Sequence, residues 1–584
     1  MKKIQVNARL TYLLASLFLV LAMLFTSSCA DGGGTADDWQ LNPNETESES
    51  GRSWLPGSPA PTPTPTPMPT PTPAPMAPPG QATIGLAAGG AKDINNFREN
   101  IKNDYLPLPT DITYEGLFYD YYFDTGQADE CNKLFCPSYT YAVTRDPFSG
   151  EVEYYLSVGL NSGMKESDFQ RKKLNLIIVL DISDSMNGGF NEYYYDKFGK
   201  KVQLSREERT TPKIEVAKEA VAALLDHLTA DDRFGMVLFN NQAYLAKPLA
   251  LVGDTDMEAI KDHILEIRAS KGTNLASGMQ LGTELLNEYA DADQSEYENR
   301  IIFLTDAMPN TGDIGEESLL GMTDKNATNH IYTTFIGIGV DFNTELVEYI
   351  TKIRGANYYS VHSPGQFRKR VDDEFEYMVT PLVFNLRLRL EAEGWEIEKV
   401  YGSPEADEAT GELMKVNTLF PSEKEEGQTR GGLILLKLKK LAEGNSLKLG
   451  VTYEDRNGNE DGSDTTVLLA DKEPEFFENN GIRKGIVLAR YADLAKNWII
   501  DEQEHAHFSR PWEPSVDRED GIIAPPPMLS KWERQSLPLT VSPGYQELFK
   551  EFSAYFASEM TAIGDDTLEQ ELDILDILGG YGAD

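Results

Sequence analysis

The chain has 584 residues, which is too long for one hydrophobic core and predicts roughly two to four domains. Apolar residues make up 40% of the sequence and aromatic residues 10%, as is typical of globular domains joined by polar segments. The formal net charge is −41, and this excess of carboxylates disfavours nucleic acid and anionic lipid surfaces as the main partners.

The N-terminus has the pattern of an export signal. Basic residues precede an apolar run over 13–25, and small residues then lead directly into Cys29. This order predicts a signal peptide over residues 1–28. An uncleaved membrane anchor is the alternative, although the apolar run is short for a spanning helix.

The residues before Cys29 resemble the lipobox of bacterial lipoproteins, with Thr26 in place of the usual Leu. The resemblance implies lipidation of Cys29 and a lipid-anchored protein of the cell envelope, either periplasmic or at the cell surface. Ala30 favours the outer membrane if the cell is Gram-negative, because Asp at this position favours retention in the inner membrane.

A polar stretch follows, and residues 56–80 alternate proline with threonine, alanine and methionine. This composition predicts a disordered Pro/Thr-rich linker over 29–81 that includes an extended polyproline II spacer. We expect the linker to hold the globular part away from the membrane.

Residues 82–171 are predicted to form a small N-terminal α+β region. A short helix is expected near 93–101, followed by an aromatic patch over 114–123 that we interpret as core. Cys131 and Cys136 flank four residues in an exported chain, which favours a short-loop disulfide over two reduced thiols.

The next region begins with a continuous apolar run over 176–180, which predicts a buried strand of a parallel sheet. Asp181, Ser183 and Ser185 follow where this strand opens into a loop. Ligands of open α/β sheets bind beyond the carboxyl ends of the strands, and carboxylate and hydroxyl oxygens suit Mg²⁺ or Ca²⁺.

Two later stretches extend this pattern. Thr273 precedes an amphipathic helix, and Asp306 ends a second buried strand over 300–305. Alternating periodicities predict a doubly wound α/β sheet. Its further strands are expected at 234–239, 243–251, 332–340 and 358–361, and its helices at 212–225, 257–267, 275–289, 319–331 and 367–378.

The ordered set D-x-S-x-S, G-T-N and L-T-D resembles the metal-ion-dependent adhesion site (MIDAS) of the von Willebrand factor type A (VWA) domain, over residues 172–380. The resemblance implies a Rossmann-like α/β fold and a Mg²⁺ ion, with Ca²⁺ or Mn²⁺ as alternatives. Because most of the inner donors are neutral hydroxyls, the ion would keep enough positive charge to bind an Asp or Glu carboxylate of a protein partner. The implied metal ligands are Asp181, Ser183, Ser185, Thr273 and Asp306.

Three features depart from the usual VWA pattern. Asp184 and Ala307 each stand where glycine is common, although neither change removes a ligand. Residues 187–211 form an insertion that, by connectivity, lies on the metal face. This insertion is either part of a partner-binding rim or a surface loop without a role.

Short alternating strands predict a β-sandwich over 381–472, and 473–584 is predicted to be a helical region with an acidic tail. An Asp/Asn/Gly-rich stretch over 455–462 is interpreted as a hairpin turn, because it lacks the twelfth-position Glu of an EF-hand. The VWA domain is thus inserted between β-rich regions.

Ahead of this domain, the order of a short helix, Leu106-Pro107-Leu108-Pro109 and the aromatic patch resembles the bacterial exported VWA proteins labelled YfbK-like. These proteins are relatives of the inter-alpha-trypsin inhibitor heavy chains, in that β modules flank their VWA domain.

These observations favour a cell-envelope lipoprotein that binds a protein through a divalent-metal site. The alternative is an envelope scaffold in which the metal is structural and the β modules make the contacts. No G-x-S-x-G, H-E-x-x-H or catalytic Cys/His arrangement stands out in the sequence, so we do not expect an enzyme. The membrane is expected to be a partner only through the lipid anchor.

Overall fold

The structure is a computed structural model of the chain and describes residues 35–41 and most of 83–582. Within the second range, the described residues exclude 92–93, 103, 110, 127–131, 190–192, 196–200, 204–205, 207–209, 271, 290–293, 307–317, 339–348, 350–351, 362, 372–373, 392–393, 404–411, 426, 443–445, 470 and 510–536.

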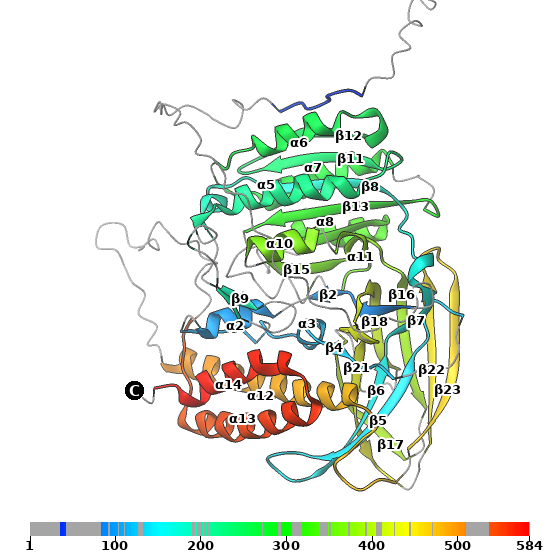
Figure 1. Cartoon of the computed structure of the whole chain (residues 1–584), viewed down its shortest axis with the longest axis vertical. Coiled ribbons are helices and arrows are strands. Elements are labelled where there is room, and N and C mark those ends of the chain that lie inside the picture. The colour runs from blue at the N-terminus through cyan, green and yellow to red at the C-terminus, as the bar shows by residue number, and fades with distance from the viewer. Residues whose placement is uncertain are drawn as a thin grey trace, which may run out of the picture.

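An α/β domain forms one end of the molecule (Figure 1). Its seven-stranded sheet has the order β12-β11-β8-β13-β14-β15-β2, with β12 antiparallel to β11 and the other neighbours parallel. The strands are β2 (Gly90–Ala91), β8 (Lys173–Asp181), β11 (Arg233–Phe239), β12 (Ala243–Leu251), β13 (Tyr297–Thr305), β14 (Ile331–Ile338) and β15 (Asn357–Val361).

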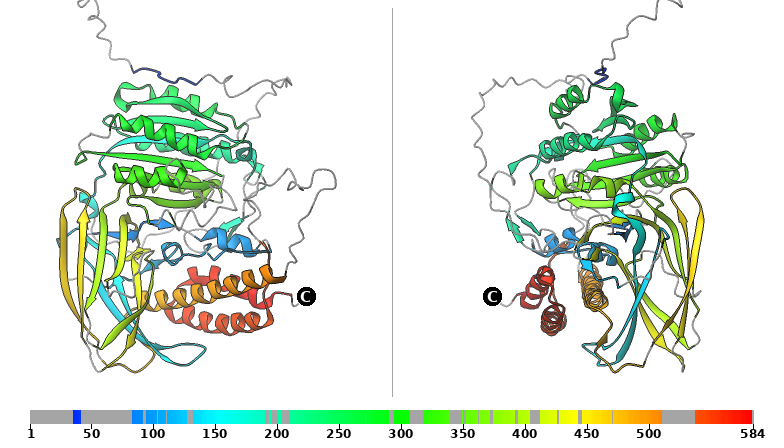
Figure 2. Two further views of the ribbon diagram at one scale, coloured as in Figure 1. Left: turned by 180° about the vertical axis from the view of Figure 1, so that it is seen from behind. Right: turned by 45° about the vertical axis from the view of Figure 1, so that its right-hand side comes forward.

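Helices cover both faces of this sheet, which confirms the doubly wound prediction (Figures 1 and 2). They are α5 (Lys213–Leu224), α6 (Met257–Leu265), α7 (Leu275–Asn287), α8 (Leu319–Thr328), α10 (Pro364–Val371) and α11 (Phe375–Val379). The side chains of β8 alternate between two apolar cores: Ile178 and Leu180 pack with α5 and α6, whereas Ile177 and Val179 pack with α7 and α8. The single helix predicted over 367–378 is instead the separate helices α10 and α11.

The other β-strands form a sandwich of two sheets. Their orders are β23-β22-β16-β18-β1-β7 and β17-β21-β6-β5-β24. The strands are β1 (Thr83–Ala88), β5 (Ser138–Arg145), β6 (Val152–Gly159), β7 (Asn161–Lys165), β16 (Val383–Glu391), β17 (Trp395–Tyr401), β18 (Glu412–Ser422), β21 (Leu433–Lys440), β22 (Ser446–Asp455), β23 (Glu460–Leu468) and β24 (Phe476–Phe477).

This sandwich corrects the prediction that 82–171 and 381–472 are separate regions. Strand β1 pairs with β18, and β6 pairs with β21, so each sheet contains strands from both sides of the α/β domain. The physical reason is that Leu156 and Val158 share one core with Leu386 and Leu436, and neither half of the sandwich buries these side chains alone.

Two glycines let the chain pass from the sandwich into the α/β sheet, between β1 and β2. A Cβ atom on Gly89 would lie 3.1 Å from the carbonyl oxygen of Thr418, so a side chain here would push against the neighbouring backbone. Gly90 has a φ of +98°, a conformation that other residues rarely adopt.

Three long C-terminal helices pack with two short helices from the N-terminal region. The helices are α2 (Asn95–Lys102), α3 (Tyr114–Tyr119), α12 (Asn480–Ser509), α13 (Pro543–Ile563) and α14 (Glu569–Gly580). Their shared core contains Phe118, Tyr121 and Phe123, which confirms that the aromatic patch is largely core. The remaining short elements are β3 (Tyr105–Leu106), β4 (Tyr122–Phe123), β9 (Tyr193–Tyr195), β10 (Lys201–Gln203), β19 (Lys424–Glu425), β20 (Gln428–Arg430), β25 (Leu537–Pro538), η1 (Glu166–Asp168), η2 (Asp184–Asn187), η3 (Leu225–His227), η4 (Val252–Asp254) and η5 (Asp566–Leu568).

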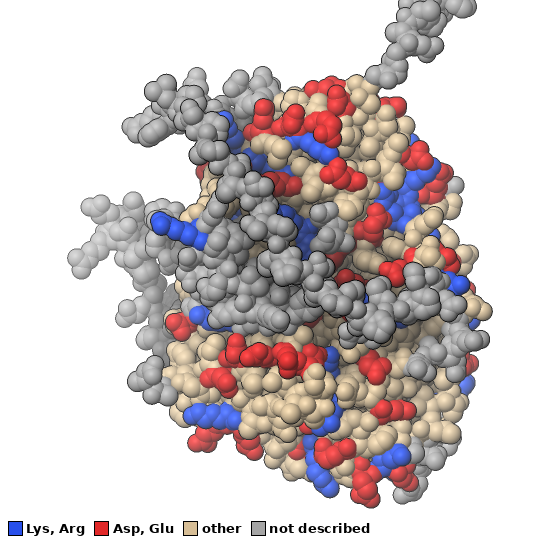
Figure 3. All heavy atoms as spheres, in the orientation of Figure 1, with Lys and Arg blue, Asp and Glu red and all other residues tan. Residues whose placement is uncertain are grey.

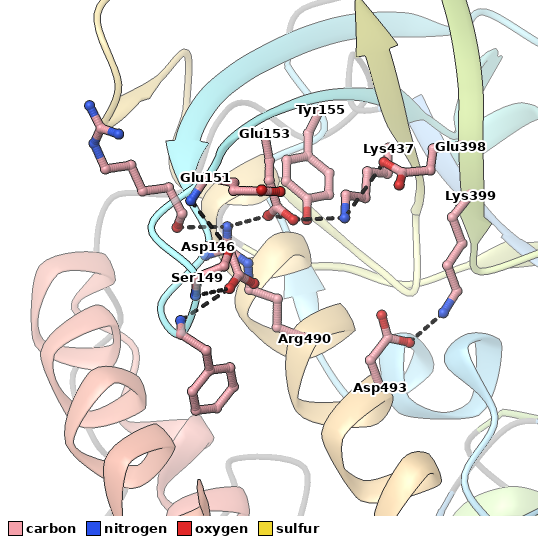
Figure 4. Close-up of polar contacts among 12 residues, drawn as sticks. Asp146, Ser149, Glu151, Glu153, Tyr155, Glu398, Lys399, Lys437, Arg490 and Asp493 are labelled. Carbon is pink, nitrogen blue, oxygen red and sulfur yellow. Dashed lines mark hydrogen bonds and ion pairs between the residues drawn. The ribbon is translucent and has the colours of Figure 1, made fainter.

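Charged side chains join helix α12 to the sandwich (Figure 4). Arg490 donates through Nη2 to Glu153 Oε2 of β6 at 2.7 Å, and Lys437 of β21 lies 2.7 Å from the other oxygen of Glu153. One turn further along the helix, Asp493 accepts a hydrogen bond from Lys399 of β17 at 2.7 Å. These pairs hold the helix at a fixed place on the five-stranded sheet.

The predicted linker over 29–81 is wrong for residues 35–41, which lie on the α/β domain. Trp39 and Leu41 pack against its core, and Asp38 pairs with the buried Lys247. The sequence of residues 35–41 is polar and aperiodic, which predicts disorder. The prediction failed because the segment binds a buried lysine, Lys247, on a strand that is distant in the sequence.

Two local predictions concern turns and cysteines. The interpretation of 455–462 as a hairpin turn is confirmed, because Asp455 Oδ1 accepts hydrogen bonds from the N–H groups of Asn457 and Asn459 at 2.8 and 2.9 Å.

Cys136 is disulfide-bonded, whereas Cys131 lies outside the described residues, so the pairing of these two cysteines stays a prediction.

On the face drawn in Figure 3, acidic side chains lie both on the α/β domain and on the C-terminal helices, with basic side chains between them. The negative charge is therefore spread over this face.

The described part of the chain contains no helix with the length and apolar character that a membrane span requires. Cys29 and the apolar run before it lie outside this part.

Candidate functional site

The candidate site lies where β8 and β13 end side by side in the middle of the α/β sheet. Leu180 is paired with Leu304, so Asp181 and Thr305 leave the two strands at the same edge. Thr305 donates through Oγ1 to Asp181 Oδ2 at 2.5 Å. The parallel register thus places Asp306, the next residue, beside the loop that follows Asp181.

A tight loop positions the two serines. The backbone N–H of Ser183 donates to Asp181 Oδ1 at 2.8 Å, and η2 begins at the next residue. The hydroxyl oxygens of Ser183 and Ser185 lie 2.9 Å apart, and Ser185 donates to Asp306 Oδ1 at 2.7 Å. Four of the five predicted ligands are therefore joined by one chain of polar contacts.

Thr273, the fifth predicted ligand, lies in a neighbouring loop. The loop is fixed on both sides, because Ser270 N–H donates to Ile182 O at 2.7 Å and Asn274 N–H donates to Asn240 O at 2.6 Å. Asn274 then caps α7 by accepting from Ser277 N–H. The side chain of Thr273 is exposed and is not part of the polar chain that joins the other four residues.

The electrostatics of the site centre on Asp181. Its side chain is buried, and burial together with the neighbouring Asp306 raises the pKa of this carboxyl to about 7. Two carboxylates that face each other in a buried place repel, so a cation between them would be favourable. The hydrogen bonds from Ser183 and Thr305 act in the opposite direction on this pKa, because they favour the charged form.

Sequence reasoning missed two residues of the site. Lys213, the first residue of α5, lies with Nζ 3.1 Å from Asp306 Oδ2. Thr305 was visible only as the residue before Asp306 in the L-T-D motif. Lys213 had no comparable signal, because it directly follows a charged insertion that contains several other lysines and arginines.

The residues present fit a hard divalent cation. The set offers two carboxylates and two hydroxyls, all of them oxygen donors, and Ser185 is exposed to solvent. Asp184 is also exposed beside this loop and adds negative charge there. No group of three or more His, Cys, Asp or Glu side chains in the described ranges could hold a metal, so the case for a cation depends on the serine hydroxyls.

Part of the predicted insertion is described. Strands β9 and β10 pair antiparallel, with Tyr194 opposite Val202, and form a short hairpin between η2 and α5. Ala307 lies outside the described residues. The choice between a binding rim and a surface loop without a role stays open.

Residues 176–308 match the family model of the von Willebrand factor type A domain. Inter-alpha-trypsin inhibitor heavy chain H1 of Homo sapiens is 25% identical over 225 residues, which cover 37% of this chain and 21% of that protein. The match thus spans about a fifth of the length of this relative.

Two solved structures are also similar to this chain. The von Willebrand factor type A structure from Catenulispora acidiphila has 14% identity and a TM-score of 0.37, and the match covers 63% of this chain and 82% of that one. The mussel byssus proximal thread matrix protein 1 structure with a zinc-occupied MIDAS motif has 17% identity and a TM-score of 0.26, over 39% and 51% of the two chains.

Fold and site together define a doubly wound α/β domain with an oxygen-rich loop at the carboxyl ends of its central strands. This domain is a VWA domain, and the part of the chain that contains it is homologous to the inter-alpha-trypsin inhibitor heavy chains.

Proposed function

We propose that this chain is a bacterial cell-envelope lipoprotein that binds a protein partner through a divalent cation at the VWA site. The observation that carries the proposal is the polar chain from the buried Asp181 through Ser183 and Ser185 to Asp306. The VWA homology and the lipobox-like residues before Cys29 support it, and they also favour a YfbK-like exported protein.

Each residue of the site has its own role. Asp181 is held in place by two hydrogen bonds, so its carboxylate needs little reorganisation to face a cation. Ser183 and Ser185 present neutral oxygens, and the exposed Thr273 of the neighbouring loop would complete the set. A bound Mg²⁺, Ca²⁺ or Mn²⁺ would supply an exchangeable position for an Asp or Glu carboxylate of the partner. This is a binding function, and we propose no catalytic step.

The metal site is tested by titration calorimetry of the full chain with Mg²⁺, Ca²⁺ and Mn²⁺. We expect at least one of these ions to bind the wild type, and Asp181→Asn together with Ser183→Ala to remove binding. Asp231→Asn is the matched control, because this exposed carboxylate of the same domain pairs with Lys173 away from the site. Equal affinity in the wild type and the double variant would overturn the metal site.

The partner is tested by crosslinked capture from envelope fractions, with the same ion, with a chelator and with the double variant. Capture that requires both the ion and the intact residues supports the proposal. Equal capture in all three conditions would instead favour the scaffold alternative, in which the β modules make the contacts. In parallel, Cys29→Ser should release the protein from the membrane fraction, and unchanged fractionation would contradict lipidation.

A further inference from the structure

Residues 35–41, which we call the strap, lie as an extended peptide against the open edge of the VWA sheet. Strand β12 is the last strand on this side of the sheet. Gln40 N–H donates to Ala246 O of this strand at 2.8 Å. At the other end of the strap, Ala36 N–H donates to Asp254 O, and Asp256 N–H donates to Ala36 O, both at 2.9 Å.

Charge complementarity fixes the strap along this edge. Lys247 of β12 has a fully buried side chain, and its ammonium donates to Asp38 Oδ2 at 3.0 Å. Its other acceptors are the backbone carbonyls of Phe234 and Pro248. Burial lowers the pKa of Lys247, and Asp38 acts in the opposite direction. A buried ammonium is costly without a counter-charge, and the carboxylate that the structure places on Lys247 belongs to the strap.

Apolar and ring contacts complete the docking. The rings of Trp39 and His263 of α6 are stacked, with centroids 5.4 Å apart and planes 12° apart. His263 Nε2 also lies 2.9 Å from Asp37 Oδ2, and this hydrogen bond lowers the pKa of Asp37. Leu41 packs with Trp39 against the core between the sheet and the α5 face.

The strap also borders a cavity beside the loop that follows Asp181. The cavity has a volume of about 650 Å³, and its walls include Trp39, Leu41, Ile182 and Ser270. Ile182 directly follows Asp181 in the sequence, and Ser270 is the residue whose N–H is bonded to Ile182 O. The strap therefore lines this cavity together with Ile182 and Ser270, which lie next to the candidate site in the sequence or through a hydrogen bond.

We propose that the edge of β12, the η4–α6 turn and His263 form a peptide-binding groove, and that its occupant is this chain's own strap. The groove recognises an extended peptide with two acidic residues followed by Trp-x-Leu. Each of these features has a partner on the VWA domain: the carboxylates meet Lys247 and His263, and the apolar side chains meet the core. Such a short docked segment opens at lower cost than the folded core, so the strap exchanges between docked and released states.

One consequence rests on the lipidation in the proposed function. Residue 29 is six positions before the first residue of the strap, so a docked strap keeps the VWA domain within about 20 Å of the lipid. Release of the strap would lengthen the segment between Cys29 and the folded domains, because residues 35–82 would then become part of it. The docking itself does not depend on the lipid, so a protein without an anchor would leave the groove intact.

Hydrogen exchange of the full chain tests the docking. In the wild type, we expect the Ala36 and Gln40 amides to exchange at least about tenfold more slowly than in an unstructured peptide. In Trp39→Ala and in Trp39→Ala with Asp38→Asn, these amides should approach the unstructured rate, and the Asp256 amide should exchange about tenfold faster. The amides of β8 should not change, which separates release of the strap from unfolding of the domain. Trp54→Ala is the matched control in the following segment.

A synthetic peptide of residues 33–43 at millimolar concentration tests the groove. It should restore slow exchange of Asp256 in the Trp39→Ala chain and leave the wild type unchanged, because the wild-type groove is already filled. Unstructured exchange of Ala36 and Gln40 in the wild type would overturn the docking. A peptide that fails to protect Asp256 in the variant would overturn the groove. Calorimetry of the same variants with divalent ions reports separately on the metal site.

Discussion

Asp181 shows how a single residue is prepared for a cation. It is buried at the end of the central strand, and Thr305 donates to the Oδ2 oxygen while Ser183 N–H donates to the Oδ1 oxygen. These two donors fix the orientation of a carboxylate whose pKa is raised by burial and by Asp306. Groups that orient a metal ligand in this way contribute to affinity without contacting the ion.

The first prediction concerns Thr305. Thr305→Val keeps the shape of the side chain but removes the hydroxyl that donates to Asp181. We expect the affinity for the divalent ion to fall about tenfold or more, while Thr305→Ser, which retains a hydroxyl, stays close to the wild type. Titration calorimetry measures both variants. Equal affinities for the valine and serine variants would show that this hydrogen bond does not position Asp181.

Among the elements, the central strands and helices of the VWA domain were predictable because their apolar residues follow clear periods. The run over 176–180 is buried on both faces in β8, and α7 begins at Leu275, where the predicted helix over 275–289 begins. Four of the predicted ligands converge for the same reason, since parallel register brings the ends of neighbouring strands together. The strap was missed because its binding depends on Lys247, far away in the sequence.

Contacts between the elements were also beyond prediction from sequence patterns. Glu374, just before α11, accepts hydrogen bonds from Arg370 of α10 and from Arg430 of β20. Arg430 also donates to the carbonyl of Tyr119 at the end of α3, so the pair of Glu374 and Arg430 joins the VWA domain to β20 and α3. No periodicity in the sequence indicates that these residues meet.

The second prediction gives this junction a pH dependence. Burial by itself would raise the pKa of Glu374, but Arg370, Arg430 and Lys369 outweigh it and hold the pKa well below the ordinary value of 4.5. Because the folded pKa is the lower one, the stabilisation is complete above about pH 4.5 and is lost as the pH falls below that value. Glu374→Gln should lower the free energy of unfolding at pH 6 by about 3 kcal/mol.

Urea unfolding of the wild type and Glu374→Gln between pH 6 and pH 3 measures this effect. The difference in stability between the two proteins should shrink steadily below about pH 4.5, because the unfolded wild type then binds a proton on Glu374 that the folded protein does not bind. Glu376→Gln is a suitable control, since Glu376 contacts Arg171 with a side chain that is 41% exposed. A difference that stays constant with pH would contradict the assigned role of the Glu374 charge.

At the scale of the whole molecule, segments from both sides of the inserted VWA domain pack together. Strands from both sides of that domain share two sheets, and helices from both ends of the described chain share one core. Glu571 of α14 accepts hydrogen bonds from Arg98 of α2, 473 positions earlier in the sequence, and from Tyr121 at 2.8 Å. This arrangement predicts that the sandwich and the helices unfold together, because neither has a complete core without both ends of the chain.

The third prediction tests this packing. Glu571 is fully buried, so Glu571→Gln leaves the guanidinium of Arg98 with one carboxylate partner, Asp120, instead of two. We expect the free energy of unfolding to fall by about 3 kcal/mol, whereas Glu569→Gln, an exposed change on the same helix, should alter it by less than about 0.5 kcal/mol. Unfolding followed both by far-ultraviolet circular dichroism and by hydrogen exchange of β6 and α14 should show one shared transition for these elements. If α14 instead exchanged well before β6 in the Glu571 variant, the C-terminal helices would be a separate folding unit, and the shared core would not couple the two ends of the chain.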